Sequence, residues 1–227
     1  LLSYPSEMSR HWIFRTNTLQ ALGGFDTHFY EAWQFEYIVR LIEHKGTQFA
    51  GHLPEPFVLA HPPVIETRAE EVALLTRHLQ RRGYPQGRVE TPANGIYALR
   101  YQHAEQPLVS IIIPTKDQLA LLKTCVTTLL EKTRYQNYEV LIVDNNSETA
   151  EARQWLAEIS LNYPGRVRVI PYPYPFNYSA INNRAAQKAR GDYLLLLNND
   201  TEVISSTWLD NLMNHGQRPE VGITGAK

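Results

Sequence analysis

The sequence has little of several features that would direct its interpretation elsewhere. Its single cysteine, Cys125, excludes an internal disulfide bond and fits a reducing compartment. Its 22 basic and 23 acidic residues give a net charge of -1, which provides no electrostatic basis for binding nucleic acid. No apolar run approaches the roughly 18 residues of a membrane span, and no signal peptide is visible. We therefore expect no membrane span and a cytoplasmic location, which includes the inner face of a membrane. Because position 1 is Leu, we also expect a piece of a longer protein.

Motifs of several common enzyme classes are also missing. The sequence contains no GxGxxG and no P-loop pattern, which argues against dinucleotide dehydrogenases and P-loop ATPases. It has no Cys/His cluster with the spacing of a metal site. It has no GxSxG element to support a serine nucleophile.

Three segments of the chain differ in pattern. At 227 residues, 43% of them hydrophobic, the chain can bury a sizeable core in one large domain or two small ones. Residues 1–62 mix short apolar runs with a helix-like stretch and predict a smaller α+β segment. Residues 63–106 predict a connector with an amphipathic helix over 68–82 and a strand over 95–101. Residues 107–227 alternate between strand and helix patterns.

The last segment predicts an α/β fold. Apolar, β-branched runs predict strands, and apolar residues at helical spacing predict helices between them. Strands that alternate with helices imply right-handed crossovers and a mostly parallel sheet flanked by helices. The expected strands cover 108–113, 139–143, 167–170 and 193–197, and the expected helices cover 117–132, 148–159 and 179–189.

Four local features refine this prediction. We expect Pro114 to end the first strand, Ser147 to cap the start of the second helix, and Gly191 to cap the end of the third. The continuous apolar run over 193–197 predicts a strand buried on both faces.

Polar side chains follow three of the predicted strands. They are Thr115 and Asp117, then residues 144–147, then Asn198 to Asp200. Because the carboxyl ends of parallel strands share one edge of a sheet, these groups can converge where open α/β sheets bind ligands. Carboxylate and amide oxygens there can hold a divalent cation and, through it, a diphosphate. The alternative is ordinary strand-end turns, which Asn and Asp also favour.

The motifs of residues 107–227 resemble family 2 glycosyltransferases, which have the GT-A (Rossmann-like) fold and use nucleotide-sugar donors. The closest similarity is to the bacterial group that builds O-antigen and other surface polysaccharides, including rhamnosyltransferase-like members. The Phe176-Asn177-Tyr178-Ser179 phrase is typical of that group. The resemblance is carried by four ordered motifs, at residues 109–115, 143–147, 182–186 and 197–200.

The resemblance implies roles for individual residues. Asp144 would accept a hydrogen bond from a uracil or thymine base, which suits a UDP- or dTDP-linked donor. Asp200 would ligate Mg²⁺ or Mn²⁺ through the diphosphate, and Asn198, where the family's first acid stands, would be a weaker ligand. Asn183 would lie near the donor sugar or diphosphate. Further nucleotide-sugar contacts would come from Pro114, Thr115, Asp117, Asn146, Ser147 and Asn199.

The first segment resembles the acceptor-side half of the same family. Leu22-Gly23-Gly24-Phe25-Asp26 followed by Phe29 and Arg40 carries this likeness. The position of the family's general base is Gln34, which cannot take a proton at neutral pH. Glu36 is a weak substitute, and its alternative interpretation is a solvated helix residue.

The resemblance implies a glycosyltransferase fragment that joins the end of one such domain to the donor half of the next. It would move a sugar from a nucleotide-diphosphate donor to a saccharide or lipid-linked saccharide in cell-surface polysaccharide synthesis. Gln34 and Asn198 favour the alternative, a catalytically degenerate nucleotide-sugar-binding or structural module. We further expect residues 1–62 to pack against the 107–227 sheet and complete the fold in permuted order.

Overall fold

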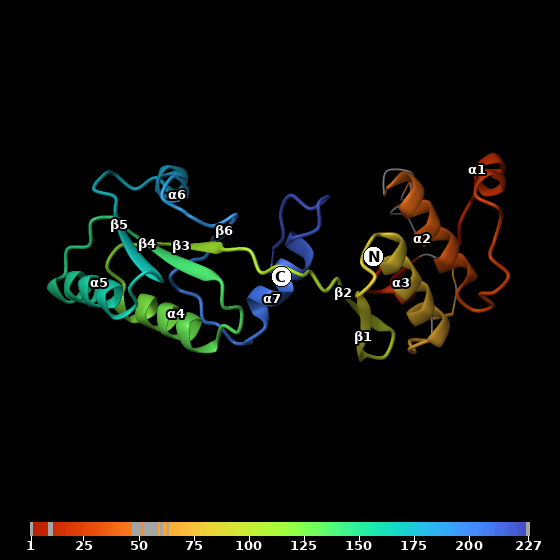
Figure 1. Ribbon diagram of the computed structural model, residues 1–227, viewed down its shortest axis with the longest axis horizontal. Coiled ribbons are helices and arrows are strands. Elements are labelled where there is room, and N and C mark those ends of the chain that lie inside the picture. Colours follow the sequence, from red (N-terminus) through yellow and green to blue (C-terminus); the bar gives the residue numbers. More distant parts are fainter. Residues whose placement is uncertain are drawn as a thin grey trace. The chain divides into compact units, whose positions relative to one another are not determined.

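The computed structural model describes residues 2–8, 11–46, 51, 59, 61–62 and 64–225. These form two compact units, Leu1–His103 and Ala104–Lys227 (Figure 1). The predicted boundary near residue 62 lies largely outside the described residues. The expectation that residues 1–62 complete the fold of the 107–227 segment stays a prediction.

The second unit is built on a four-stranded parallel sheet. Its strands have the order β5-β4-β3-β6, which confirms the predicted parallel α/β architecture. Helices α4 and α5 lie on one side of the sheet and α6 on the other (Figure 1). The strands are β3 (Val109–Thr115), β4 (Tyr138–Asp144), β5 (Val167–Pro171) and β6 (Tyr193–Leu196), and the helices are α4 (Leu119–Lys132), α5 (Ala150–Asn162), α6 (Tyr178–Ala186) and α7 (Trp208–Gly216).

The sheet separates two apolar cores. Side chains of β3 and β4 alternate between its faces, as strand geometry requires. One core joins the sheet to α4 and α5 through residues such as Ile111, Val126 and Leu156. The other joins it to α6 through residues such as Ile112 and Ile181. Both faces of the two central strands are therefore buried.

Two predicted strand features are wrong. Strand β3 continues through Pro114, because β3 pairs with β6 only as far as Ile112 and a proline there removes no hydrogen bond from that ladder. Strand β6 is not buried on both faces, since Leu194 and Leu196 are 50% and 52% exposed. The reason is its position: β6 is at the edge of the sheet, and the core under α6 is built on the other three strands.

Two predicted helix caps are also wrong. Helix α5 begins after Thr149, whose side chain accepts a hydrogen bond from the Ala152 amide at 3.3 Å, so Ser147 is not the cap. Helix α6 ends at Ala186, well before Gly191. Gly191 is instead required by close packing, because a Cβ atom there would lie 2.6 Å from the Leu108 carbonyl oxygen.

A buried carboxylate joins the amino ends of all four strands. The Glu139 side chain on β4 is 1% exposed. It accepts hydrogen bonds from Ser110 on β3 at 2.7 Å and from Arg168 on β5 at 2.8 Å. Arg190, just before β6, donates to it through its amide and Nε, both at 2.8 Å. Burial raises the pKa of Glu139, but the hydrogen bonds from Ser110, Arg190 and Arg168 outweigh it and hold that pKa below 4.5.

The first unit packs helices against a hairpin. Its elements are η1 (Pro5–Glu7), α1 (Thr16–Ala21), α2 (Trp33–Lys45), α3 (Ala69–Arg81), β1 (Arg88–Ala93) and β2 (Ile96–Arg100). The predicted connector helix and strand are confirmed as α3 and β2, whereas β1, the antiparallel partner of β2, was not predicted. Phe35 and Val39 of α2 share one core with Leu75 of α3 and Tyr97 of β2. The predicted connector is thus part of the same unit as α2.

Among the described residues, no helix combines the length and apolar character needed to cross a bilayer.

We predict that Glu139→Gln lowers the free energy of unfolding by about 2–4 kcal/mol at pH 7, because two guanidinium groups lose their buried partner. A carboxyl whose pKa is lowered by folding stabilises the protein above its unfolded pKa. This contribution disappears as the pH falls below about 4.5. Urea unfolding of both proteins between pH 7 and pH 3 measures the difference.

The exposed Glu131→Gln in α4 is the control, since it removes one carboxylate without breaking this network. The difference between wild type and Glu139→Gln should shrink in acid. A difference that stays constant across this range contradicts the assigned role.

Candidate nucleotide-binding site at the carboxyl edge of the sheet

The three predicted polar clusters meet at the carboxyl edge of the second unit's sheet. Thr115, the last residue of β3, pairs in register with Asp144, the last residue of β4. On the other side of β3, the pairing with β6 ends at Leu196, so Asn198 to Asp200 follow directly beyond it. The Asn199 side-chain amide donates to the Thr115 hydroxyl at 3.3 Å and links these strand ends.

Asp144 is half-buried at the centre of this edge. Its Oδ1 accepts from the Ser147 amide at 3.0 Å and from the Ser147 hydroxyl at 2.6 Å. Both bonds use the same oxygen, so Oδ2 is the atom that can accept from a ligand. A carboxylate fixed in this way presents an oriented acceptor, which is the group that an imide N–H requires.

Asp117 and Ser147 connect the loops after β3 and β4. The Asp117 amide donates to the Ser147 hydroxyl at 2.9 Å. The Asp117 carboxylate accepts from the amides of Thr149 at 3.0 Å and Glu148 at 2.9 Å, and these hydrogen bonds lower its pKa. The structure therefore shows both residues supporting Asp144; direct contact of either with a nucleotide stays a prediction.

Asn145 belongs to the predicted 144–147 cluster, but the sequence analysis assigned it no role. Its buried side-chain amide donates to the backbone oxygens of Tyr172 at 3.0 Å and Tyr174 at 2.8 Å. Its own amide donates to the Thr115 carbonyl at 2.8 Å. Asn145 thus holds the proline-rich loop after β5 against the carboxyl edge. The sequence contained a signal for this role: the carbonyl groups of that loop need hydrogen-bond donors, and its prolines have no N–H group to donate.

Two small side chains stabilise the turn that contains Asn198 and Asp200. The Thr201 hydroxyl donates to the Asn198 carbonyl at 2.8 Å. The Cys125 thiol, from α4, lies 3.6 Å from that same carbonyl and 3.5 Å from the Thr201 hydroxyl. Burial raises the pKa of the Cys125 thiol, which keeps it protonated and able to donate. The side chains of Asn198 and Asp200 remain exposed.

The residues at this turn fit a metal ion that binds together with a diphosphate. The described residues contain no group of three or more His, Cys, Asp or Glu side chains that could hold a metal ion. One carboxylate, Asp200, and one amide oxygen, Asn198, make an incomplete site. Mg²⁺ is commonly bound by one or two carboxylates together with substrate phosphates. The donor set therefore suits a cation shared with a diphosphate.

The remaining predicted residues differ in exposure. Asn183 on α6 and Asn146 after β4 are exposed, and Pro114 is half-buried at the end of β3. Asn182, next to Asn183, is buried, and its side-chain amide donates to the Tyr178 carbonyl at 2.8 Å. Of these two asparagines, Asn183 is the one whose side chain can meet a ligand without rearrangement.

In the first unit, Glu36 is a buried ion-pair residue. Its side chain is 1% exposed, so it is not the solvated residue of the alternative interpretation. One oxygen accepts from Arg40 Nη2 at 2.7 Å and the other from Arg77 Nη2 at 2.7 Å. With both oxygens bound by guanidinium groups and the side chain buried, this carboxylate is not accessible to a substrate hydroxyl. This geometry argues against the expectation that Glu36 replaces the general base.

We predict that Thr201→Val weakens the binding of Mn²⁺ with a nucleoside diphosphate by about ten-fold, because groups that orient metal ligands typically contribute at that level. Thr201→Ser keeps the hydroxyl and should bind like the wild type. Isothermal titration calorimetry measures both. Equal binding by Thr201→Val and wild type would show that the turn does not depend on this hydroxyl.

Two curated relatives are similar to almost the whole chain. The chain is 39% identical over 233 residues to the O-antigen biosynthesis protein RfbC of Myxococcus xanthus, covering 96% of this chain and 18% of that protein. It is 34% identical over 226 residues to the uncharacterized protein y4gI of Sinorhizobium fredii, covering 95% of this chain and 25% of that protein. The chain therefore spans a quarter or less of the length of these relatives.

Among solved structures, the mannosyltransferase PcManGT from Pyrobaculum calidifontis, in complex with GDP-Man and Mn²⁺, matches with a TM-score of 0.48 and 20% identity. The match covers 52% of this chain and 35% of that one. The model of the family described as glycosyl transferase family 2 matches residues 110–227. The match covers more than half of the chain, and the chain therefore belongs to glycosyl transferase family 2.

Proposed function

We propose that this chain is the donor-binding part of an inverting glycosyltransferase with the GT-A fold. It takes a sugar from a UDP- or dTDP-linked donor and passes it to a saccharide or lipid-linked saccharide in cell-surface polysaccharide synthesis. The second unit binds the nucleotide sugar, and the first 62 residues are the acceptor-side part of such a domain. Family membership and the similarity to an O-antigen biosynthesis protein support this proposal.

The observation that carries the proposal is the meeting of Asp144, Thr115 and Asp200 at one edge. Register pairing places Asp144 beside Thr115, and the Asn199–Thr115 hydrogen bond brings the 198–200 turn to the other side of β3. The proposed base acceptor, Asp144, and the proposed metal ligand, Asp200, thus lie on either side of one central strand. This order matches a nucleoside diphosphate, whose base and phosphates are separated by a ribose.

The residues of this edge would bind and orient the donor. Asp144 Oδ2 accepts from the imide N–H of the base, while Thr115 and Pro114 form the wall of the nucleotide pocket. Asp200, with Asn198, would hold Mg²⁺ or Mn²⁺ against the diphosphate. When bound, the metal ion stabilises the negative charge of the leaving group. Asn183 on α6 faces the sugar or diphosphate from the other side.

The transfer itself is a direct displacement at the anomeric carbon. The acceptor hydroxyl oxygen forms the new bond to that carbon. The bond from the carbon to the diphosphate oxygen breaks, and its electron pair leaves with the diphosphate. The hydroxyl proton passes to a general base. Gln34 cannot take this proton, and Glu36 is held by Arg40 and Arg77, so this chain supplies the donor side of the reaction.

The absence of a working general base at Gln34 also favours a second candidate function. The chain would be a nucleotide-sugar-binding module without turnover, which organises a larger transferase. Gln34 at the base position and Asn198 in place of an acid favour it. Donor binding is common to both functions, so the first experiment concerns binding rather than activity.

We predict that UDP or dTDP binds in a metal-dependent way and that Asp200→Ala weakens this binding at least ten-fold, since the metal ion loses its carboxylate ligand. Isothermal titration calorimetry with and without Mn²⁺ measures this. Asp192→Ala is a matched control, because Asp192 is an exposed acid at the opposite end of the same strand.

Binding that requires Mn²⁺, is lost in Asp200→Ala and persists in Asp192→Ala supports the proposal. If neither nucleotide binds under any condition, the donor site is wrong and the structural-module function is favoured.

A further inference from the structure

One buried carboxylate of the first unit, Glu71, differs from the others in the chain. Among the described residues, three glutamates are buried: Glu36, Glu71 and Glu139. Glu36 and Glu139 each form ion pairs with two arginines, at 2.7 to 2.8 Å. Within the described ranges, Glu71 forms no ion pair, and its one hydrogen bond comes from the Tyr97 hydroxyl. Because charged side chains are rarely buried without a partner of opposite charge, Glu71 lacks a cation.

The groups that hold Glu71 do not supply that charge. The Tyr97 hydroxyl donates to its Oε2 at 2.5 Å, and the Arg68 amide donates to the Tyr97 oxygen at 3.0 Å. Burial and the bond to Glu71 raise the pKa of Tyr97 to about 12, so the phenol stays neutral. Glu71 lies in the first turn of α3, where the helix contributes only a partial positive charge. The second oxygen, Oε1, therefore remains available to a ligand.

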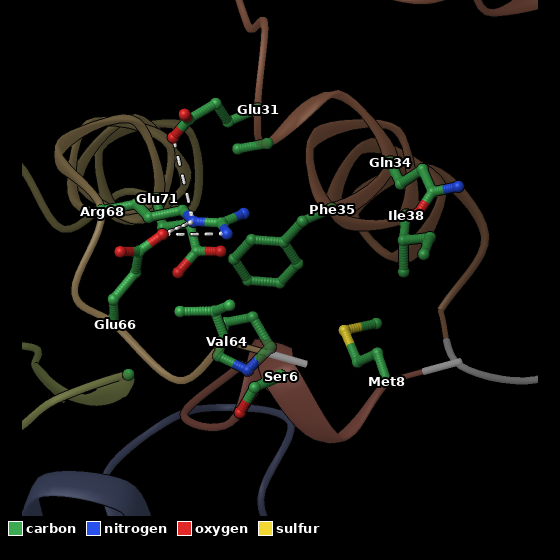
Figure 2. Close-up of a pocket in the computed structure, with 13 residues that line it drawn as sticks. Ser6, Met8, Glu31, Gln34, Phe35, Ile38, Val64, Glu66, Arg68 and Glu71 are labelled. Carbon is green, nitrogen blue, oxygen red and sulfur yellow. Dashed lines mark hydrogen bonds and ion pairs between the residues drawn. The ribbon is translucent and has the colours of Figure 1, made fainter. Parts of the chain in front are cut away.

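Glu71 faces a pocket that the donor site does not use. The pocket has a volume of about 200 Å³ and lies among η1, the start of α2 and the segments before α3 and β2. Figure 2 shows the carboxylate of Glu71 and the ring of Phe35 directed into it. Because drug-sized ligands usually occupy roughly 300–1,000 Å³, this pocket suits a smaller group.

The other charges of the lining do not neutralise Glu71. Arg68 is the only cation among the described residues that line the pocket. Its guanidinium pairs with Glu66 at 3.1 Å and with Glu31 at 3.8 Å (Figure 2), and both of these acids also line the pocket. The described lining thus has three carboxylates and one guanidinium, so it repels an anion and attracts a cation.

The rest of the lining favours a cation that carries carbon. Phe35 and Ile38 of α2, together with Met8 and Val64, supply apolar surface. Apolar groups pack against such a surface, and an aromatic ring also attracts a cation. The described residues contain no group of three or more His, Cys, Asp or Glu side chains that could hold a metal ion, which argues against an inorganic cation.

We propose that this pocket binds an alkylammonium group, with its nitrogen at Glu71 and its carbon chain against Phe35 and Ile38. The charge of the lining selects this class over a nucleotide or a neutral molecule, so the inference does not rest on the proposed function. A free amine and a lysine side chain of another protein carry the same group, and the test separates them.

The test uses the full chain and butylammonium chloride, titrated into the millimolar range and followed by ¹H–¹⁵N NMR. Butan-1-ol is the matched neutral probe, because it has the same carbon chain and an O–H donor but no charge. Shifts should be concentrated at residues that line the pocket, with an affinity for butylammonium about ten-fold or more above that for butan-1-ol. Sodium chloride at the same concentrations controls for ionic strength.

Two variants of the pocket and one control accompany the titration. Glu71→Gln keeps an oxygen for the Tyr97 hydroxyl but removes the charge, so butylammonium affinity should fall about ten-fold or more. Val64→Trp spares the core, since Val64 lines the pocket but is 67% exposed, and a large side chain there should block the ligand. Glu90→Gln is the control, because Glu90 pairs with Arg100 at an exposed position of the hairpin.

Shifts that are selective for butylammonium, that are lost in Glu71→Gln and Val64→Trp and that persist in Glu90→Gln support the proposal. It is overturned by absence of shifts, by shifts located elsewhere, by an equal response to butan-1-ol or sodium chloride, or by wild-type affinity in Glu71→Gln. Nα-acetyl-lysine amide, titrated in the same way, separates the two sources. Its binding supports a lysine side chain as the ligand, and binding of butylammonium alone supports a free amine.

The pocket and the donor site can fail separately. The pocket lies wholly within the first unit, so Glu71→Gln should bind UDP and Mn²⁺ like the wild type. If butylammonium binds at the pocket and no nucleotide binds anywhere, the donor assignment fails while this inference stands. If nucleotide binds and butylammonium does not, only this inference fails.

Discussion

The buried carboxylate of Glu139 is the interaction on which the sheet of the second unit depends. It accepts from Ser110, Arg168 and Arg190, and so ties together the amino ends of strands that lie far apart in the sequence. Gly191 allows the chain entering β6 to approach β3 closely enough for this arrangement. Because the ion pairs that hold the sheet lie at its amino ends, the polar side chains at the carboxyl edge are available to bind a ligand.

At the carboxyl edge, the polar residues divide into those that support and those that can bind. Ser147 and Asp117 fix Asp144. Asn145 fixes the loop after β5, and Thr201 fixes the turn at 198–200 after β6. Two of these bonds join a side chain to a backbone group of another loop, and two lie within a single turn, so the edge is formed before any ligand arrives. Preorganised acceptors cost less to order on binding. In the first unit, the Tyr97 hydroxyl orients the Glu71 carboxylate in the same way.

The sequence predicted the order of strands and helices and the place where polar groups converge. These features depend on periodicity and on the rule that parallel strands end at one edge, which are local or topological. Contacts between distant segments were not predictable from pattern. Gly191 and Ser147 were both interpreted as helix caps. Gly191 instead packs closely against Leu108, and the Ser147 hydroxyl accepts from the Asp117 amide. The exposure of Leu194 follows from the edge position of β6, which an apolar run does not reveal.

The central claim is that a nucleoside diphosphate and a metal ion bind together at the carboxyl edge. Paramagnetic broadening by Mn²⁺ in ¹H–¹⁵N NMR spectra, recorded with and without UDP or dTDP, tests it most directly. We expect broadening around Asp200, Thr115 and Asp144 only when nucleotide is present, with the amide of Glu139 at the other end of β4 far less affected. Broadening that ignores the nucleotide, or that is centred away from this edge, would contradict it.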